Sequence, residues 1–242
     1  MSETVERGLD ALFAPLEGAG AWVVGQLGQS LDGRIATVTG HSHYVNGPED
    51  IRRLHRLRAL ADAVVVGAGT AASDDPRLTV REVDGPDPVR VVLDPRGRLP
   101  RGLRLFTDGA APTRVIRSAG STTAGSGSEA GYGPGVDVWR LDLDARGRLD
   151  PRAVVARLRA EGLRRILVEG GGVTVSGFLE ADALDRLHLS VAPVLIGSGR
   201  PGITLPPIQT MDQAMRPPIR RFLLGSDLLF DLDLRGGTGP RG

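Results

Sequence analysis

Short apolar runs recur along the chain, separated by turn-forming residues, and they predict the strands of a sheet. Most of these runs do not alternate strictly between apolar and polar positions, which is typical of strands buried on both faces. The last two runs are separated only by Gly225, Ser226 and Asp227, which predicts a hairpin. The predicted strands are residues 21–27, 63–67, 78–81, 89–93, 114–117, 136–141, 166–169, 187–196, 221–224 and 228–234.

A second pattern, with apolar residues three or four positions apart, predicts helices between the strands. One helix follows residues 46–50, where Pro48 and two acidic residues suit the first helical turn. Another covers residues 150–162, and a third begins after the three glycines at 170–172 and runs to about Glu180.

The first of these helices carries both an apolar stripe and a set of arginines. The stripe consists of Ile51, Leu54, Leu57 and Leu60. Since arginine side chains are mostly solvated, the other positions are expected to form an exposed face, and His55 among them is expected to be solvated too. One of these arginines can still point at an anionic substrate. They are Arg52, Arg53, Arg56 and Arg58.

Strands that alternate with helices predict an α/β fold, with a mixed, mostly parallel sheet flanked by helices and a C-terminal antiparallel hairpin. The length of 242 residues suits a single domain, which we place at residues 21–235. Residues 118–135 are mostly Gly, Ser, Thr and Ala, which predicts a flexible surface loop rather than a boundary between two domains. Residues 1–20 and 236–242 are expected to be a flexible extension and a loose tail.

Composition and charge narrow the range of partners. Lys and Arg total 30 and Asp and Glu 29, and a net charge of +1 gives no reason to expect nucleic acid. Every one of these cations is arginine, which excludes a lysine Schiff base. Without cysteine the chain has no disulfide, thiolate nucleophile or cysteine-ligated metal. No apolar run approaches the roughly 20 residues that cross a bilayer, and the N-terminus lacks a signal-peptide pattern, so we expect a cytoplasmic protein not bound to membrane.

Two glycine-rich corners stand where predicted strands lead into helices, the place where ligands collect in open α/β sheets. Glycine lets backbone N–H groups approach an anion without a Cβ in the way, and a helix N-terminus favours negative charge. Either corner alone can be a plain tight turn, and Ala72 in the third glycine position disfavours the dinucleotide motif. Together they predict a ligand that carries phosphates. The first corner holds Gly67, Gly69 and Thr70, and the second holds Gly170, Gly171, Gly172, Val173 and Thr174.

Two acidic residues beside the corners have alternative explanations. Glu169 ends an apolar strand, where it can be a capping or salt-bridged acid, or can accept hydrogen bonds from the amine edge of a ligand. Asp74, in an Asp-Asp-Pro sequence, can simply belong to a turn. His41 and His43 have no third ligand nearby, so no metal site is expected.

Several longer motifs occur in an order that resembles one known family. They are Ser30-Leu31-Asp32-Gly33-Arg34-Ile35-Ala36, Leu57-Arg58, Val66-Gly67-Ala68-Gly69-Thr70, Asp74-Asp75-Pro76-Arg77-Leu78-Thr79-Val80-Arg81, Leu167-Val168-Glu169-Gly170-Gly171-Gly172 and Ala192-Pro193-Val194-Leu195-Ile196-Gly197. Over residues 21–234 this series resembles the reductase half of the bifunctional pyrimidine deaminase/reductase of riboflavin biosynthesis. The Ser-Leu-Asp-Gly and Asp-Asp-Pro motifs are far more specific than the glycine corners.

The resemblance implies a fold like that of dihydrofolate reductase, and a homodimer. Members of the family use NADPH to reduce the ribosylamino group of 5-amino-6-(5-phosphoribosylamino)uracil to a ribitylamino group, with hydride delivered to C1′ of the opened sugar. The chain has no Pro-Cys-x-x-Cys motif for the zinc of the deaminase, so we expect a stand-alone reductase.

Matching positions imply the contacts of a phosphorylated pyrimidine substrate. Arg58 and Arg81 are expected to clamp the ribose phosphate through charge-assisted hydrogen bonds, and Glu169 to accept hydrogen bonds from the uracil-amine end. The candidate proton donors in catalysis are Glu169, Asp74 and water. The implied substrate contacts are Gln26, Ser42, Arg58, Leu78, Arg81 and Glu169.

Matching positions likewise imply the contacts of NADPH. The nicotinamide is expected near Gly28, where the missing Cβ permits a close approach, and Arg96 or Arg98 is expected to meet the adenosine 2′-phosphate. The implied cofactor contacts are Gly28, Tyr44, Gly67, Gly69, Thr70, Asp74, Arg96, Gly170, Gly171, Gly172, Val173 and Thr174.

Three positions depart from the family pattern. Gln26 stands where members commonly carry a lysine, Tyr44 where a tryptophan is frequent, and Pro95 where a serine often follows Asp94. The missing cation at position 26 leaves two alternatives open. One is a reductase of another pterin-like or imine substrate, and the other is a non-catalytic nucleotide-binding protein.

Overall fold

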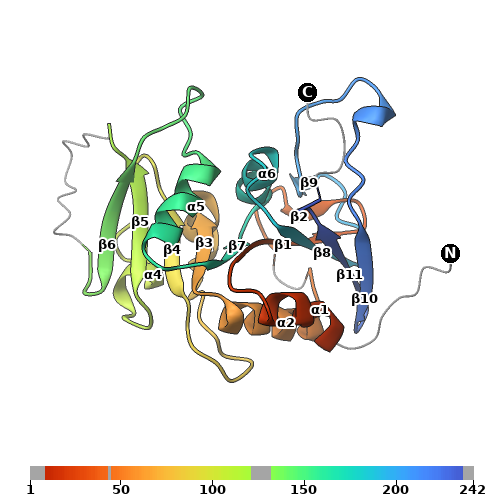
Figure 1. The fold of residues 1–242 in the computed structure, drawn as a ribbon, viewed down its shortest axis with the longest axis horizontal. Helices are drawn as coiled ribbons and strands as arrows, with labels where there is room; N and C mark the ends of the chain where they lie inside the picture. Colours follow the sequence, from red (N-terminus) through yellow and green to blue (C-terminus); the bar gives the residue numbers. More distant parts are fainter. Residues whose placement is uncertain (1–8, 43–44, 121–131, 237–242) are drawn as a thin grey trace.

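Nine strands form one sheet in this computed structural model, which describes residues 9–42, 45–120 and 132–236. Their order across the sheet is β10-β11-β8-β1-β7-β3-β4-β5-β6 (Figure 1). β11 runs antiparallel to β8 and β10, and the other neighbouring pairs are parallel. The strands are β1 (Trp22–Ser30), β3 (Ala63–Gly67), β4 (Val89–Leu93), β5 (Thr113–Ser118), β6 (Val136–Leu141), β7 (Arg165–Glu169), β8 (Arg186–Ala192), β10 (Ile219–Leu224) and β11 (Asp227–Asp233).

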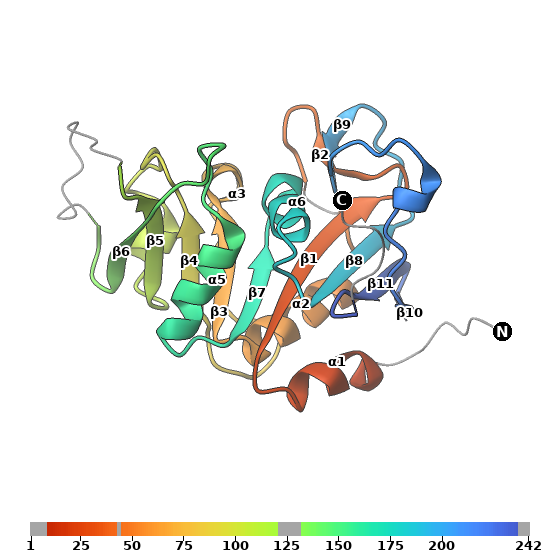
Figure 2. The same cartoon turned by 45° about the horizontal axis from the view of Figure 1, so that its top comes forward.

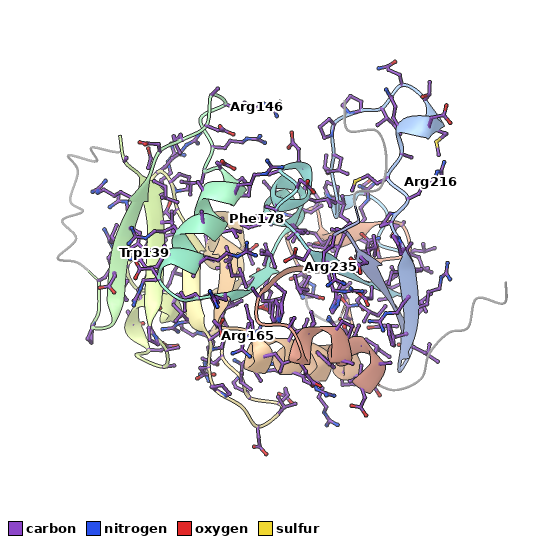
Figure 3. The ribbon with its side chains drawn as sticks, viewed as in Figure 1. Trp139, Arg146, Arg165, Phe178, Arg216 and Arg235 are labelled. Atoms are coloured by element: carbon purple, nitrogen blue, oxygen red, sulfur yellow. The ribbon has the colours of Figure 1, made fainter. Side chains whose placement is uncertain are left out.

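Helices cover both faces of the sheet and enclose two apolar cores. α1 and α2 lie together on one face, whereas α5 and α6 cover the other (Figure 2). Leu57 of α2 belongs to the first core, and Val154 of α5 and Phe178 of α6 belong to the second. Phe178 is labelled on α6 in Figure 3. The helices are α1 (Asp10–Glu17), α2 (Pro48–Leu60), α3 (Ala68–Asp74), α4 (Arg104–Thr107), α5 (Pro151–Ala160) and α6 (Gly172–Glu180), with a 3-10 turn at Met211–Gln213.

These elements confirm the predicted fold class of a mixed, mostly parallel sheet flanked by helices with a C-terminal antiparallel hairpin. The three predicted helices are present and differ from prediction by a few residues at their ends. The cause of the parallel order is the alternation of strand and helix, because parallel neighbours need a crossover connection between them.

α1 differs from the sequence prediction, which assigned residues 1–20 to a flexible extension. Leu12, Phe13 and Leu16 of this helix are 0–2% exposed and pack in the same core as α2. Arg56 of α2 holds α1 from outside, since its guanidinium lies 4.3 Å from the centre of the Phe13 ring and forms ion pairs with acids at both ends of α1. Residues 10–17 therefore belong to the folded domain.

One further predicted strand is absent, and another is shorter than predicted. Residues 78–81 form no strand, because Leu78 has a φ of 56°, in the left-handed region that interrupts an extended run. The strand predicted to reach residue 196 ends at Ala192.

A second, two-stranded sheet was not predicted from the sequence. It pairs β2 (Arg34–Thr37) with β9 (Gly199–Pro201) in antiparallel fashion, and it joins two segments that lie far apart in the chain. The flexible loop predicted at 118–135 and the tail predicted at 236–242 fall mostly on residues outside those described.

Candidate functional site

A groove of about 1260 Å³ is lined by the carboxyl ends of β1, β7, β3 and β4 and by the N-terminal turns of α3 and α6. It brings together both glycine-rich corners and nearly all the residues implied by the resemblance. These are Gln26, Gly28, Ser42, Arg58, Gly67, Gly69, Thr70, Asp74, Leu78, Arg96, Arg98, Glu169, Gly170, Gly171, Gly172, Val173 and Thr174. Tyr44 lies outside the described residues.

Arg81 lines a smaller pocket of about 300 Å³ beside the groove. Arg58, Asp74 and Leu78 line both hollows, so the two share one side. The small pocket is rich in guanidinium groups. Partial desolvation, and then the positive charges of Arg58 and Arg77, lower the pKa of Arg81 from its ordinary value. This excess of positive charge suits an anion such as a phosphate.

A hydrogen bond joins the two glycine-rich corners. The backbone N–H of Gly171 donates to the hydroxyl oxygen of Thr70 at 2.8 Å, so the β3–α3 and β7–α6 turns form one continuous side of the groove. A threonine hydroxyl at the start of a helix can cap its own turn or bind a phosphate oxygen. In the structure the hydroxyl oxygen of Thr70 accepts the N–H of Gly171 from the second corner, and the hydroxyl proton can be donated to a ligand.

Two of the corner glycines are explained by packing inside the protein. A Cβ at Gly67 would lie 2.2 Å from the hydroxyl oxygen of Thr174, and a Cβ at Gly172 would lie 1.9 Å from the carbonyl oxygen of Gly202. These glycines let α6 approach β3 and the segment after β9. Around Gly69, in contrast, a Cβ would meet nothing within 4 Å.

The N-terminus of α6 offers free backbone donors to the groove. Within the described part of the chain, the N–H groups of Gly172 and Val173 have no hydrogen-bond acceptor, and no side chain caps the helix. Unpaired first-turn N–H groups and the positive end of the helix dipole attract an anion. This corner therefore fits the phosphate groups of a nucleotide.

The space beside Gly28 is filled by a neighbouring side chain. A Cβ at Gly28 would lie 2.0 Å from the side-chain oxygen of Asn46, whose amide nitrogen donates to Ser190 at 3.0 Å and Asp227 at 3.2 Å. The missing Cβ at Gly28 therefore makes room for Asn46, and the expected place of the nicotinamide near Gly28, which lines the groove, stays a prediction.

Four polar side chains lie in register across the sheet, on the face that α2 covers. Gln26 of β1 is paired with Glu169 of β7 and His188 of β8, and His188 is paired with Asp231 of β11. Directly opposite residues on neighbouring strands point to the same face. Gln26 and Glu169 line the groove, whereas His188 and Asp231 are fully buried beside them.

Arg58 of α2 binds Glu169 rather than standing free for a phosphate. Its Nη2 lies 2.5 Å from Oε1 of Glu169, and its Nε donates to both carboxylate oxygens at 3.0 and 3.1 Å. Its Nη1 donates to the carbonyl oxygen of Thr79 at 3.1 Å. Most of its N–H donors are therefore used within the protein, and the expected clamp by two arginines rests mainly on Arg81. The ion pair with Arg58 bears out the salt-bridged alternative for Glu169, and its contact with the amine edge of a ligand stays a prediction.

Arg53 is fully buried, which corrects the prediction of a solvated arginine face. Its Nε donates to Asp50 at 2.6 Å, its Nη2 donates to Gln26 at 2.6 Å, and its Nη1 lies 3.3 Å from Nδ1 of His188. The sequence carried no signal for this cluster, because its members come together only when α2 packs on β1 and β8. Gln26 stands where the family commonly carries a lysine, and the guanidinium of Arg53 lies directly beside it.

His55 is buried as well, at 3% exposure, and not solvated as expected. Its Nδ1 accepts the backbone N–H of Arg81 at 2.9 Å. Burial, and then the positive charges of Arg58 and Arg81, lower the pKa of His55 to about 4. The neutral imidazole therefore holds the segment that carries Arg81 against α2.

The loop after β4 presents two arginines at the groove. Asp94 is buried and accepts the backbone N–H groups of Arg98 at 3.0 Å and Leu99 at 3.1 Å, and Gly97 makes the turn with a φ of 63°. Arg96 and Arg98 are exposed where they line the groove. Asp74 is also exposed there, and accepts a hydrogen bond from Ser73 at 2.6 Å.

Metal-binding clusters and membrane-spanning helices are both absent from residues 9–42, 45–120 and 132–236. No three His, Asp or Glu side chains in these segments are grouped so that they can hold a metal ion. No helix in the same segments has the length and apolar character to cross a membrane.

Comparison with known proteins identifies a family that this chain matches. The RibD C-terminal domain family matches residues 21–219. The 2,5-diamino-6-ribosylamino-4(3H)-pyrimidinone 5′-phosphate reductase of Methanothermobacter thermautotrophicus is 36% identical over 224 residues, which cover 89% of this chain and 99% of the relative. The reductase of the same name from Archaeoglobus fulgidus is 33% identical over 187 residues, 69% of this chain and 78% of the relative.

A solved structure shares the fold. It is the diaminohydroxyphosphoribosylaminopyrimidine deaminase/5-amino-6-(5-phosphoribosylamino)uracil reductase of Thermotoga maritima, with a TM-score of 0.72 and 26% identity. The match covers 88% of this chain and 56% of the Thermotoga protein, so the chain spans little more than half of that relative.

Proposed function

The chain belongs to the RibD C-terminal domain family, and on that premise we propose that it reduces the ribosylamino group of a 6-ribosylaminopyrimidine 5′-phosphate to a ribitylamino group, with NADPH as reductant. The observation that carries the proposal is the pair of adjoining hollows. One has free helix N-terminal donors beside two joined glycine corners, and the other is rich in arginine. A dinucleotide and a sugar phosphate need these two environments side by side.

The cofactor would be held by backbone groups along the joined corners. The N–H groups of Gly172 and Val173 would bind the pyrophosphate, and the hydroxyl of Thr70, which has no acceptor among the described residues, would donate to it. Arg96 and Arg98 would meet the 2′-phosphate that distinguishes NADPH from NADH. When bound, the nicotinamide supplies the hydride, while the protein contributes binding, orientation and electrostatics.

The substrate phosphate would lie in the small pocket with Arg81. With the phosphate there, the Arg58–Glu169 pair would meet the pyrimidine. The carboxylate oxygens of Glu169 are paired with one guanidinium and still have lone pairs that can accept hydrogen bonds from amine groups. Of the two acids considered for proton transfer, Glu169 is held by Arg58 whereas Asp74 has Ser73 as its one hydrogen-bond donor among the described residues. We therefore assign proton transfer to Asp74.

Two pyrimidine rings are candidates for the substrate. The two archaeal relatives are named for a 2,5-diaminopyrimidinone, and the Thermotoga protein for a 5-aminouracil, which carries oxygen in place of the 2-amino group. An amine at this edge suits a carboxylate such as Glu169 better than a carbonyl does. The diaminopyrimidinone is therefore the first substrate to assay.

A homodimer is part of the proposal. Exposed apolar side chains lie on β10, which is an edge strand of the sheet among the described residues, and on the segments around β2 and β9. They include Leu31, Val38, Val194, Leu195, Leu205, Ile208, Met211, Met215, Ile219 and Leu223. Light scattering of the purified protein would give twice the mass of the 25.5 kDa chain, and a monomer mass would contradict this part.

Thermal unfolding tests the cofactor assignment. A ligand at 100 times its Kd stabilises the folded state by about 2.7 kcal/mol, which raises Tm by roughly 5–10 °C in a chain of this size. NADPH is expected to give this shift and NADH a much smaller one. The double variant R96A/R98A is expected to abolish the difference. Equal shifts in the unaltered protein would contradict the choice of NADPH, and no shift with either nucleotide would contradict the proposed function.

A further inference from the structure

Asp50 is a buried carboxylate at the groove to which the proposed function assigns no role. It lies in the first turn of α2, its side chain is 5% exposed, and it lines the groove together with Leu54 and Arg58 of the same helix. Residues four positions apart lie on one face of a helix, so this face of α2 borders the groove. Because a helix rises about 1.5 Å per residue, Asp50 and Arg58 are roughly 12 Å apart along its axis and meet different parts of a ligand.

The two oxygens of the Asp50 carboxylate have different surroundings. Oδ1 accepts a hydrogen bond from Nε of Arg53 at 2.6 Å, and this guanidinium is fully buried. Oδ2 accepts no hydrogen bond from any described residue. The described side-chain atoms that are enclosed without a partner belong to other residues, so Oδ2 is open to the groove. Arg53 thus holds one oxygen and balances the charge, while the other oxygen is available to a donor on a ligand.

Glu169, the acid bound to Arg58, differs from Asp50 in this respect. Its two oxygens receive three hydrogen bonds from Arg58, so each of them already accepts within the protein. The groove therefore offers a carboxylate that is largely satisfied and, elsewhere on α2, one with an open oxygen. The amino groups at C2 and C5 of a 2,5-diaminopyrimidinone lie on opposite sides of the ring, so a single carboxylate cannot bind both. With Glu169 at the 5-amino side, Asp50 is suited to the 2-amino side.

The two candidate rings differ at the edge that contains C2. In the 2,5-diamino-4(3H)-pyrimidinone, the 2-amino group and the N3–H group are neighbouring donors, which match a carboxylate much as a guanidinium does. In the uracil, C2 carries a carbonyl oxygen, which would face Oδ2 of Asp50 with no proton between the two oxygens. A buried carboxylate left without a donor is costly, so a site of this kind rejects a ring that lacks the N–H group.

We propose that Asp50 selects a 2-aminopyrimidinone ring over a uracil ring, because its Oδ2 accepts a hydrogen bond from the 2-amino group of the substrate. This inference rests on the proposed function and names the residue that determines ring specificity within it. Asp50 transfers no proton in this role. In the unaltered protein, kcat/KM is expected to favour the diaminopyrimidinone phosphate by about 10- to 100-fold, the effect of one hydrogen bond to a charged group.

The variant Asp50→Asn tests the assignment and keeps the shape of the side chain. Because Arg53 can only donate, the amide oxygen takes the place of Oδ1 and the amide NH2 group faces the groove. This group donates to the C2 carbonyl of a uracil but cannot accept from a 2-amino group. The ratio of kcat/KM for the diaminopyrimidinone to that for the aminouracil is therefore expected to fall by at least about tenfold. An unchanged ratio would overturn the proposal.

Glu49→Gln is the matched control. Glu49 is the neighbouring acid in the first turn of α2, but it is exposed and lies outside the groove. The control removes the same charge from the same helix end, so an effect that Asp50 has only through the helix dipole would occur in both variants. The control is expected to keep the ring preference of the unaltered protein. An equal loss of preference in Glu49→Gln would overturn a direct contact with Asp50.

Calorimetry on the unaltered protein gives a second test, which does not depend on the folding of Asp50→Asn. The probes are the ribitylamino products of the two rings, 2,5-diamino-6-ribitylamino-4(3H)-pyrimidinone 5′-phosphate and 5-amino-6-(5-phosphoribitylamino)uracil. The first is expected to bind at least about tenfold more tightly, and equal Kd values would overturn the proposal.

The two measurements separate failure of this inference from failure of the proposed function. If the protein reduces both pyrimidines with NADPH at similar kcat/KM, the function stands and the role of Asp50 is overturned. If it reduces neither, the proposed function fails. Tighter binding of the diaminopyrimidinone product would then still support the contact with Asp50, and equal or absent binding of both products would overturn it.

Discussion

The guanidinium of Arg58 and the carboxylate of Glu169 form a buried ion pair that joins helix α2 to the end of strand β7, with Nη2 and Oε1 2.5 Å apart. The two side chains are 9% and 10% exposed, and 111 residues separate them in the chain. Both line the groove, so a single unit offers the ligand the remaining lone pairs of a carboxylate whose charge is already balanced.

Removing the charge of Glu169 is expected to destabilise the fold. Glu169→Gln leaves the Arg58 guanidinium buried without a counter-ion, which reduces the free energy of unfolding by about 3 kcal/mol. The matched control is Glu161→Gln, because the Arg157–Glu161 pair is 41% and 43% exposed and its loss changes stability by less than about 1 kcal/mol. Urea unfolding measures both values. Similar losses in the two variants would show that burial of the Arg58–Glu169 pair has no special effect.

Arg81→Ala is expected to separate substrate binding from cofactor binding. Its guanidinium lines the small pocket and donates to Thr79, so its removal takes positive charge from the proposed phosphate site but leaves the glycine corners intact. KM for the pyrimidine phosphate should rise by about 10- to 100-fold, the effect of losing a charge-assisted contact of about 1.5–3 kcal/mol. The Kd of NADPH, measured by calorimetry, should stay within about twofold. A collapse of NADPH affinity instead would place the cofactor in this pocket.

Gly171→Val is expected to weaken NADPH binding without unfolding the protein. The backbone of Gly171, with φ of −68° and ψ of 162°, accepts a valine, but a Cβ there lies 3.2 Å from the Thr70 hydroxyl and its methyl groups crowd the joined corners. The Kd of NADPH should rise at least about tenfold, equivalent to about 1.4 kcal/mol. Gly20→Val, in open space before β1, serves as the control. Full NADPH affinity in Gly171→Val would mean that the cofactor lies elsewhere.

Stability should fall between neutral pH and pH 4 because of His55. The pKa of this residue is about 4 in the fold and about 6.5 when unfolded, so in this interval the unfolded chain binds a proton that the folded chain does not. The free energy of unfolding should therefore drop by up to about 3 kcal/mol as the pH falls from 6.5 to 4. Buried His188, whose pKa is also lowered, acts in the same direction.

The variant His55→Gln isolates this contribution. Its amide oxygen can still accept the N–H of Arg81 but does not titrate, so the pH dependence between 4 and 6.5 should become shallower. His41→Gln, at an exposed position, should keep the slope of the unaltered protein. Identical slopes in all three proteins would contradict a buried neutral His55.

Local patterns were enough to predict the sheet, three helices and both glycine corners. Strand and helix periodicity is a property of neighbouring residues, so it can be read within short windows. α1 was missed because glycines flank it, Pro15 lies inside it and its apolar stripe is short, although Leu12, Phe13 and Leu16 have helical spacing. The motif resemblance also predicted most of the residues that line the groove, because the motifs fall at strand ends that the fold brings together.

The polar side of α2 could not be predicted from the sequence. Arginine is ordinarily solvated, and only partners from distant strands reverse that expectation. Gln26, Glu169 and His188 supply such partners, and they meet Arg53 and Arg58 because β7, β1 and β8 are adjacent in the sheet. Sequence spacing carries no information about that adjacency.

The oxidation of NADPH by purified protein, followed by absorbance with each candidate substrate side by side, tests the central claim most directly. The account predicts rapid oxidation with 2,5-diamino-6-ribosylamino-4(3H)-pyrimidinone 5′-phosphate or its 5-aminouracil counterpart, a product that has gained two hydrogens by mass spectrometry, and no oxidation with dihydrofolate. Oxidation with dihydrofolate alone, or tight binding of NADPH without reduction of either pyrimidine, would contradict it.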